Sequence, residues 1–116
     1  MQKIEKWRVE ELSLLLGWLV SLLKEGLNPE WAAVFSHFDD ESREILAVDP
    51  VNRAKLEKLV HSIKACFAPP CSFLYLSLAR GNPAEQNGLD AEFLGVKVRL
   101  CRALKDIEDR LRDYVN

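Results

Sequence analysis

Two adjacent prolines, Pro69 and Pro70, interrupt a chain whose apolar residues otherwise recur at helical spacing on both sides. Proline lacks the amide hydrogen that a helix needs, and its ring collides with the preceding turn, so no helix continues through this pair. The stretch that follows, Ser72 to Leu78, is apolar at most positions. It fits a short buried extended segment or a buried helical turn, which periodicity cannot separate at this length.

The first helix is predicted from Ile4 to Glu25, where leucines repeat every three or four residues. Its apolar face is broad, because three further apolar residues fall outside the main stripe: Leu14, Trp18 and Val20. Gly17 lies in the middle of this helix, where glycine costs about 1 kcal/mol relative to alanine. We therefore expect another helix to approach closely there, and Gly26 to end the helix in the left-handed conformation.

Capping residues predict where the remaining helices begin. A side chain that accepts a hydrogen bond, followed by proline, is a typical helix start, and two such pairs occur. The predicted starts are Asn28-Pro29 for a second helix, Asp39 or Asp40 for a short third helix through Leu46, Asp49-Pro50 for a fourth, and Asp90 for the last, which follows a loop from Arg80 to Gly88. Leu89 and Leu94 match a hydrophobic staple at that last start. The predicted apolar face of this last helix consists of Leu94, Val98, Cys101, Leu104, Ile107, Leu111 and Val115.

These patterns predict an all-α single domain over residues 1–116, a bundle of about five helices with the apolar segment near 72–78 packed on it. The chain has 116 residues, 48% of them apolar, which is enough for one core without a metal or a disulfide. The amino-terminal residues lack an apolar signal region, and the apolar run from Leu12 to Leu23 is too short for a bilayer, which needs about 20 apolar residues. We expect a cytoplasmic protein with no membrane partner.

The composition and the absence of known motifs argue against catalysis, metal binding and nucleic-acid binding by this chain. The net charge is −2, and the late arginines alternate with acidic residues, so intrahelical ion pairs explain them better than nucleic-acid binding. The cysteines Cys66, Cys71 and Cys101 are expected to be buried thiols, and His37 and His61 fall in no metal or catalytic pattern. We expect no enzyme activity, no catalytic residue, no metal and no cofactor.

The feature that favours a function is a cluster of negative charge. Between residues 39 and 49 the only cation is Arg43, whereas five carboxylates occur: Asp39, Asp40, Glu41, Glu44 and Asp49. Such an edge can steer a basic protein toward it. Asp39, Asp40, Glu41 and Glu44 are the predicted steering contacts, with Trp31 or Phe38 as apolar anchors. The alternative is a scaffolding or regulatory module that associates with itself through the broad first helix. The protein is thus expected to be a monomer or a homodimer: a homodimer that hides Leu14, Trp18 and Val20 would favour scaffolding, and a monomer would favour binding of a separate protein.

Three places along the chain resemble a family of small, uncharacterised bacterial helical domains. They are the passage Gly26-Leu27-Asn28-Pro29-Glu30-Trp31-Ala32 after a leucine-rich first helix, Phe67 with the later pair Ser72-Phe73 leading to Leu76 and Leu78, and a closing helix from Ala91 to Tyr114. The family has a glycine-rich turn before the Ser-Phe pair and a polar residue after it, whereas this chain has residues 68–71, Ala-Pro-Pro-Cys, and then Leu74-Tyr75.

Small acidic helical bacterial domains of this kind are similar to immunity proteins, which bind and block a cognate toxin. The resemblance therefore implies a non-enzymatic immunity protein or antitoxin whose partner is a protein toxin with a basic surface. It implies no catalytic residue.

Overall fold

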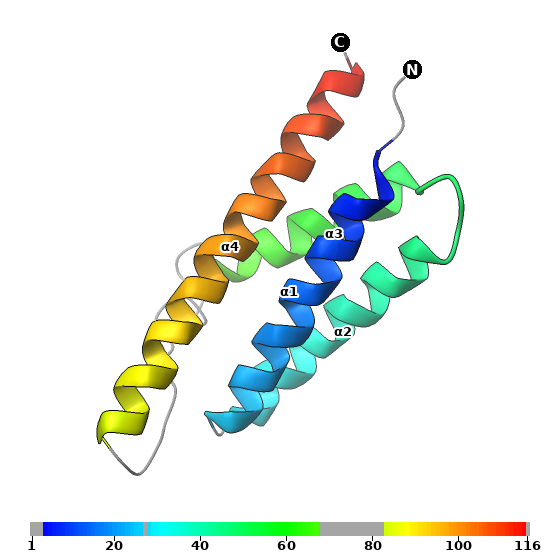
Figure 1. The fold of residues 1–116 in the computed structure, drawn as a ribbon. Helices are drawn as coiled ribbons and strands as arrows, with labels where there is room; N and C mark the ends of the chain where they lie inside the picture. Colours follow the sequence, from blue (N-terminus) through cyan, green and yellow to red (C-terminus); the bar gives the residue numbers. More distant parts are fainter. Residues whose placement is uncertain (1–3, 27, 68–82, 116) are drawn as a thin grey trace.

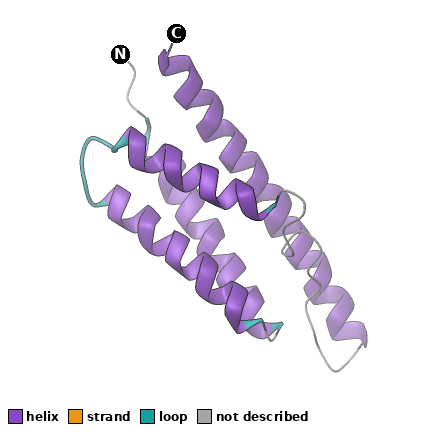
Figure 2. Ribbon diagram, turned by 180° about the vertical axis from the view of Figure 1, so that it is seen from behind, coloured by secondary structure: helices purple, strands orange, loops and turns teal. Residues whose placement is uncertain are grey.

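The computed structural model describes residues 4–26, 28–67 and 83–115, with the side chains of the last range described over residues 88–112. Four helices account for most of them: α1 (Lys6–Glu25), α2 (Pro29–Leu46), α3 (Arg53–Cys66) and α4 (Pro83–Val115). No strand occurs in these ranges, as Figure 2 shows. The all-α prediction is therefore confirmed for the described residues. The apolar segment near 72–78 lies outside them.

The four helices in the described residues pack as a ring in which each packs mainly against two others. α1 packs against α2 and α4, and α3 packs against the same two helices. In Figure 1, α1 runs antiparallel to both α2 and α4, while α3 crosses behind. The molecule measures 52 × 26 × 20 Å, and its long dimension matches the length of roughly 50 Å expected for the 33 residues of α4.

The centre of the core is built from leucines of α1 that face the inside of the bundle. Leu12, Leu16, Leu19 and Leu23 are fully buried, together with large side chains of the other helices: Phe35, Leu56, Leu59, Ile63, Leu100 and Leu104. Phe35 is the centre of an aromatic group, with ring centroids 6.2 Å from Trp31, 5.5 Å from Phe38 and 6.4 Å from Phe67. This group joins α2 to the end of α3.

The carboxyl-terminal end of α1 differs from the prediction in the backbone conformation of Gly26. The start of α2 differs in the hydrogen bond that the side chain of Asn28 makes. Gly26 has φ −83° and ψ 11°, so it does not adopt the predicted left-handed conformation, and its N–H bonds to the carbonyl of Leu22 at 2.9 Å. Asn28 does stand at the cap position of α2 with Pro29 after it, but its side-chain amide donates to the carbonyl of Gly26 at 2.8 Å. A Cβ on Gly17 would lie 3.8 Å from a carboxylate oxygen of Asp39, which is ordinary contact rather than a forced close approach.

The predicted short third helix is wrong, because α2 continues unbroken to Leu46 through both aspartates proposed as its cap. The predicted fourth start at Asp49-Pro50 is also wrong: the cap of α3 is Asn52, whose side-chain oxygen accepts from the amide of Lys55 at 3.1 Å. Because the second and third predicted helices are one helix, the described residues contain four helices where about five were expected.

α4 begins earlier than predicted. It starts at Pro83, so the expected loop residues Asn87 and Gly88 and the expected cap Asp90 all lie inside a helix. The staple is wrong as well, since Leu89 is buried but Leu94 is 60% exposed. The buried stripe of α4 is Leu89, Phe93, Val96, Leu100, Ala103, Leu104, Ile107 and Leu111. The predicted stripe is right for Leu104, Ile107 and Leu111, whereas Leu94, Val98 and Cys101 are exposed and lie one or two positions from the buried residues. The side chain of Val115 lies outside the described residues.

Candidate functional site

Most carboxylates of α2 are at the surface of the bundle, on the side of the helix away from its buried residues. Asp40 and Glu44 are exposed and one helical turn apart, and Glu41 is half-buried beside them. Glu41 pairs with His37, with 2.8 Å between the carboxylate oxygen and Nε2. Among the described residues, neither Asp40 nor Glu44 takes part in an ion pair. We call Glu30, Asp40, Glu41 and Glu44 the acidic face of α2.

Asp39 does not belong to this face, contrary to the prediction. It is only 7% exposed, because it points toward α1. Its carboxylate accepts a hydrogen bond from Ser13 Oγ of α1 at 2.6 Å and lies 3.1 Å from the guanidinium of Arg43. Ser42, which is fully buried, donates to the backbone carbonyl of Asp39 at 2.6 Å. Asp39 therefore ties α2 to α1, and a partner cannot reach it without separating the two helices.

The two predicted apolar anchors are also placed inward. Phe38 is 9% exposed and packs edge-on against Phe35, so it is a core residue rather than a surface anchor. Trp31 is half-buried and packs against the same ring. The apolar side chain that does reach the surface is Val34, which is 38% exposed.

Sequence reasoning missed Val34 and Glu30 as members of this surface. Residues 30, 34, 37, 41 and 44 recur every three or four positions, so they share one face of α2. That spacing was available in the sequence. The predicted break at Asp39 and Asp40 concealed it, because a new helix there would have reset the register.

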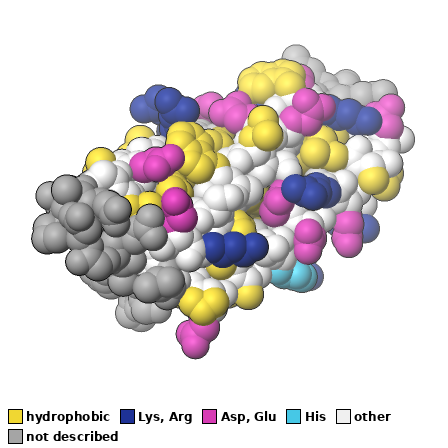
Figure 3. All heavy atoms as spheres, turned by 60° about the horizontal axis from the view of Figure 1, so that its bottom comes forward, with side chains coloured by type: hydrophobic (Ala, Val, Ile, Leu, Met, Phe, Trp, Pro, Cys, Tyr) yellow, Lys and Arg dark blue, Asp and Glu magenta, His cyan; other side chains and the backbone are white. Residues whose placement is uncertain are grey.

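Lysines of α3 limit the acidic face on one side. Between α2 and α3 lies a groove of about 220 Å³ lined by Glu41, Glu44, Ile45, Lys55, Lys58 and Ser62. Figure 3 shows the same mixture at larger scale, with acidic, basic and apolar side chains interspersed on the visible surface. The negatively charged surface on α2 therefore covers a smaller area than the sequence predicts, because lysines of α3 border it.

A second surface of mixed chemistry lies where α1 and α4 meet. A groove of about 460 Å³ is lined by Glu11, Leu14, Leu15, Trp18, Arg99 and Arg102. Trp18 is 37% exposed; its Nε1 donates to Glu92 at 3.0 Å, and the guanidinium carbon of Arg99 lies 5.7 Å from its ring centroid. We call Glu11, Leu14, Trp18, Arg99 and Arg102 the α1–α4 face. Val20, predicted as part of the same broad face, is buried.

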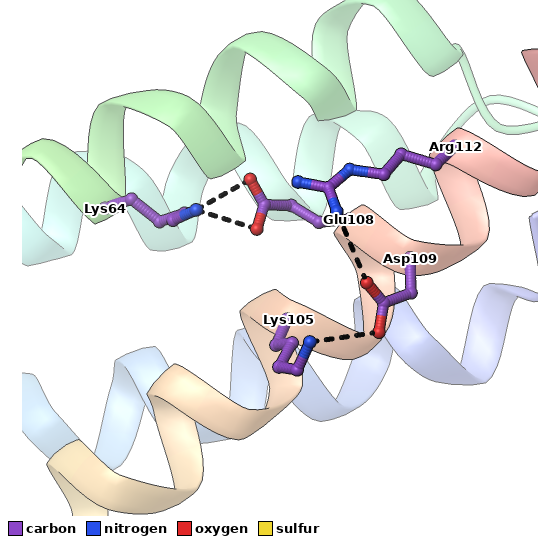
Figure 4. Close-up of polar contacts among 5 residues, drawn as sticks. All are labelled: Lys64, Lys105, Glu108, Asp109 and Arg112. Carbon is purple, nitrogen blue, oxygen red and sulfur yellow. Dashed lines mark hydrogen bonds and ion pairs between the residues drawn. The ribbon is translucent and has the colours of Figure 1, made fainter.

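The charges near the end of α4 are paired, both within the helix and across it. Figure 4 shows Lys105 and Arg112 on either side of Asp109, at 3.5 and 4.0 Å, which confirms the predicted intrahelical pairs there. In the same view, the ammonium group of Lys64 on α3 contacts both oxygens of Glu108 at 2.7 Å. Arg110 bonds to Glu5 before α1 at 2.8 Å. The pairs of Glu108 with Lys64 and of Arg110 with Glu5 hold α4 against the rest of the bundle.

The thiols and imidazoles are placed as follows. Cys66 is half-buried and Cys101 is exposed at a groove of about 480 Å³ beside Phe67, so the prediction of burial is wrong for Cys101. Partial burial nonetheless raises the pKa of the Cys101 thiol. Cys71 lies outside the described residues. His61 lines a groove of about 520 Å³ between α3 and α4, and no cluster of three potential metal ligands occurs in the part of the chain that the structure describes.

None of the helices that the structure describes is both long enough and apolar enough to cross a membrane. Comparison of the chain with protein-family models, curated proteins and solved structures finds no match.

Proposed function

We propose that this protein is a non-enzymatic immunity protein or antitoxin that binds a protein toxin through the acidic face of α2. The observation that carries the proposal is the pair of exposed carboxylates, Asp40 and Glu44, without an ion-pair partner among the described residues. A carboxylate that already forms an ion pair attracts a second cation less strongly than one that does not. Unpaired carboxylates on a rigid helix attract a basic protein and raise its association rate.

The structure of α2 supports a surface that exists before the partner arrives. The helix is anchored from its inner side by Phe35 and by the hydrogen bond between Ser13 and Asp39. A face on an anchored helix loses little conformational entropy on binding, which favours affinity. Val34, exposed between Glu30 and Glu41, supplies apolar contact within the same face.

The test is a variant in which three acids of the face become lysine: Asp40→Lys, Glu41→Lys and Glu44→Lys. Lysines near the end of a helix interact favourably with its dipole, which offsets part of the repulsion from Lys55 and Lys58 in the neighbouring groove. We therefore expect the variant to fold, with some loss of stability. Wild type and variant are used as bait in lysate of the native host, and the association rate of the captured protein is measured at several salt concentrations. We expect the variant to associate more slowly by about tenfold or more at low salt.

A matched control carries the same change of net charge elsewhere. Glu25, Glu57 and Asp106 are exposed and lie on three other helices, so Glu25→Lys, Glu57→Lys and Asp106→Lys should leave the rate close to that of the wild type. An equal loss in both variants would show that net charge alone matters. An unchanged rate in the first variant would contradict the proposed role of the acidic face.

A further inference from the structure

Large apolar side chains are exposed on the outer side of α1, both within the α1–α4 face and just before it at Trp7. On α1, Leu14 is 76% exposed, Trp7 is 53% exposed and Trp18 is 37% exposed. Residues 7, 11, 14 and 18 are spaced by three or four positions, so they form one stripe along the outer side of α1. In Figure 1 this helix lies in front of α2 and α3, beside α4.

The charges that border this stripe have opposite signs on its two helices. Glu10 and Glu11 of α1 are exposed, and Arg99 and Arg102 of α4 are exposed on the other side of the groove. No carboxylate forms an ion pair with Arg99 or Arg102 among the described residues, although both belong to a helix in which other basic residues are paired. A surface that holds both signs in this way is complementary to itself.

We propose that the α1–α4 face is the contact surface of a homodimer with two-fold symmetry. In such an interface the same patch meets itself, so both charge signs must be present on it. An antiparallel crossing of the two α1 helices places Trp7 opposite Trp18 of the second copy and Leu14 opposite Glu11 of the second copy. Because Arg102 lines the same groove as Leu14, the incoming Glu11 then lies beside Arg102.

The composition of the face agrees with this occupant, and its size corresponds to a weak dimer. The stripe from residue 7 to residue 18 is about 17 Å long, so a face two helices wide covers roughly 300 Å² there. A standard interface buries roughly 800 Å² on each partner, so we expect a dimer that forms only at high concentration. Tryptophan and arginine are also the residues that dominate binding energy at such interfaces.

The experiment measures the mass of the full chain by sedimentation equilibrium between about 1 and 300 µM, a range that covers dissociation constants of moderate strength. We expect the wild type to reach dimer mass within this range. Leu14→Glu should weaken association by about tenfold or more, because it buries a charge at the centre of the interface. Leu14 is 76% exposed in its own chain, so its replacement should leave the thermal midpoint unchanged when it is measured at a concentration at which the wild type is monomeric.

Two further sets of variants test the register and the specificity. Arg102→Glu and Glu11→Arg should each weaken association, and the double variant should recover it, because the charge pair is restored with its signs exchanged. Val34→Glu changes an exposed apolar residue on α2 and is the matched control, for which we expect no change. Fluorescence offers a second readout, since Trp7 and Trp18 should shift to shorter wavelength as the dimer forms.

A wild type that remains monomeric over the whole range overturns the proposal. So does a dimer whose dissociation constant is the same in Leu14→Glu and in Val34→Glu. If the double variant associates no more tightly than the single variants, the two-fold register given above is wrong.

Discussion

The residue whose role changes most between sequence and structure is Asp39. It is a buried carboxylate that accepts from Ser13 and lies beside Arg43, so it joins two helices rather than facing a partner. Net hydrogen bonds to charged groups contribute about 1.5–3 kcal/mol to stability.

We therefore expect Asp39→Ala to lower the free energy of unfolding by about 2–3 kcal/mol. Ser13→Ala should cost about 1 kcal/mol, and the double variant should cost less than the sum, because both changes remove the same bond. Urea denaturation of the four proteins measures this. Asp40→Ala, one position along and exposed, is the control and should stay within about 0.5 kcal/mol of the wild type. Full additivity of the two changes would show that the bond contributes nothing.

Glu5 gives the fold a defined dependence on pH. A hydrogen bond from the Arg8 side chain holds the pKa of the Glu5 carboxyl below its usual value of 4.5, and the positive charges of Arg8 and Arg110 act in the same direction. A carboxyl whose pKa is lower in the folded than in the unfolded state stabilises the fold above 4.5. That contribution is lost as the pH falls through the folded value.

Glu5→Gln should consequently be less stable than the wild type near neutral pH and nearly equal to it well below 4.5. Urea midpoints measured across this range test the prediction. A constant difference between the two proteins at every pH would mean that the Glu5 charge is not involved. Glu10, which is exposed and one helical turn or more away, gives the control Glu10→Gln.

At the scale of elements, the early start of α4 has a direct consequence for Gly88. The sequence predicts a loop there, whereas the structure places Gly88 in a helix interior with open space around its Cα. Gly88→Ala should then raise the free energy of unfolding by about 0.5–1 kcal/mol, and Gly88→Pro should lower it by about 3 kcal/mol. Denaturation followed by circular dichroism measures both. Gly95→Ala, in the same helix and equally open, should match the first gain. A proline tolerated at 88 would place that residue in a loop.

Helix existence was predictable from the sequence, but several helix boundaries were not. Leucine periodicity identified α1 correctly to within two residues at its start, and Asn28-Pro29 marked the start of α2. The sequence wrongly predicts a helix start at Asp39 and Asp40. An aspartate is typical of a helix cap, but it also occurs inside a helix when its carboxylate accepts a hydrogen bond from a neighbouring helix. The hydrogen-bond partner of Asp39, Ser13, is 26 positions away and becomes visible only when α1 and α2 pack.

The candidate surfaces were likewise predictable from the sequence only in part. Asp40, Glu41 and Glu44 were named from the sequence as steering contacts, and the structure places all three on the outer side of α2. The groove between α1 and α4 was beyond sequence reasoning, because Trp18 and Arg99 are brought together by tertiary packing alone. Local spacing predicts which residues share a helix face, and only the fold determines which faces meet.

At the scale of the whole molecule, the two proposed surfaces lie on different helices, so they should act independently. Asp40→Lys, Glu41→Lys and Glu44→Lys together should leave the self-association of the chain unchanged, and Leu14→Glu should leave the association rate with a toxin unchanged. Variants more than about 10 Å apart with no shared partner usually add. Sedimentation and binding kinetics of both variants and of their combination measure this, and a loss of both properties in either one would show that the surfaces are coupled.

The ring of contacts also determines what is exposed while the chain is being made. α1 and α2 are adjacent in the chain and can pair early, whereas α4, which covers Leu15 and bonds to Trp18, is synthesised last. At about 5–20 residues per second, the ribosome needs several seconds to pass from the end of α2 to the end of α4. During that interval the uncovered flank of α1 is open to chaperones or to a neighbouring nascent chain.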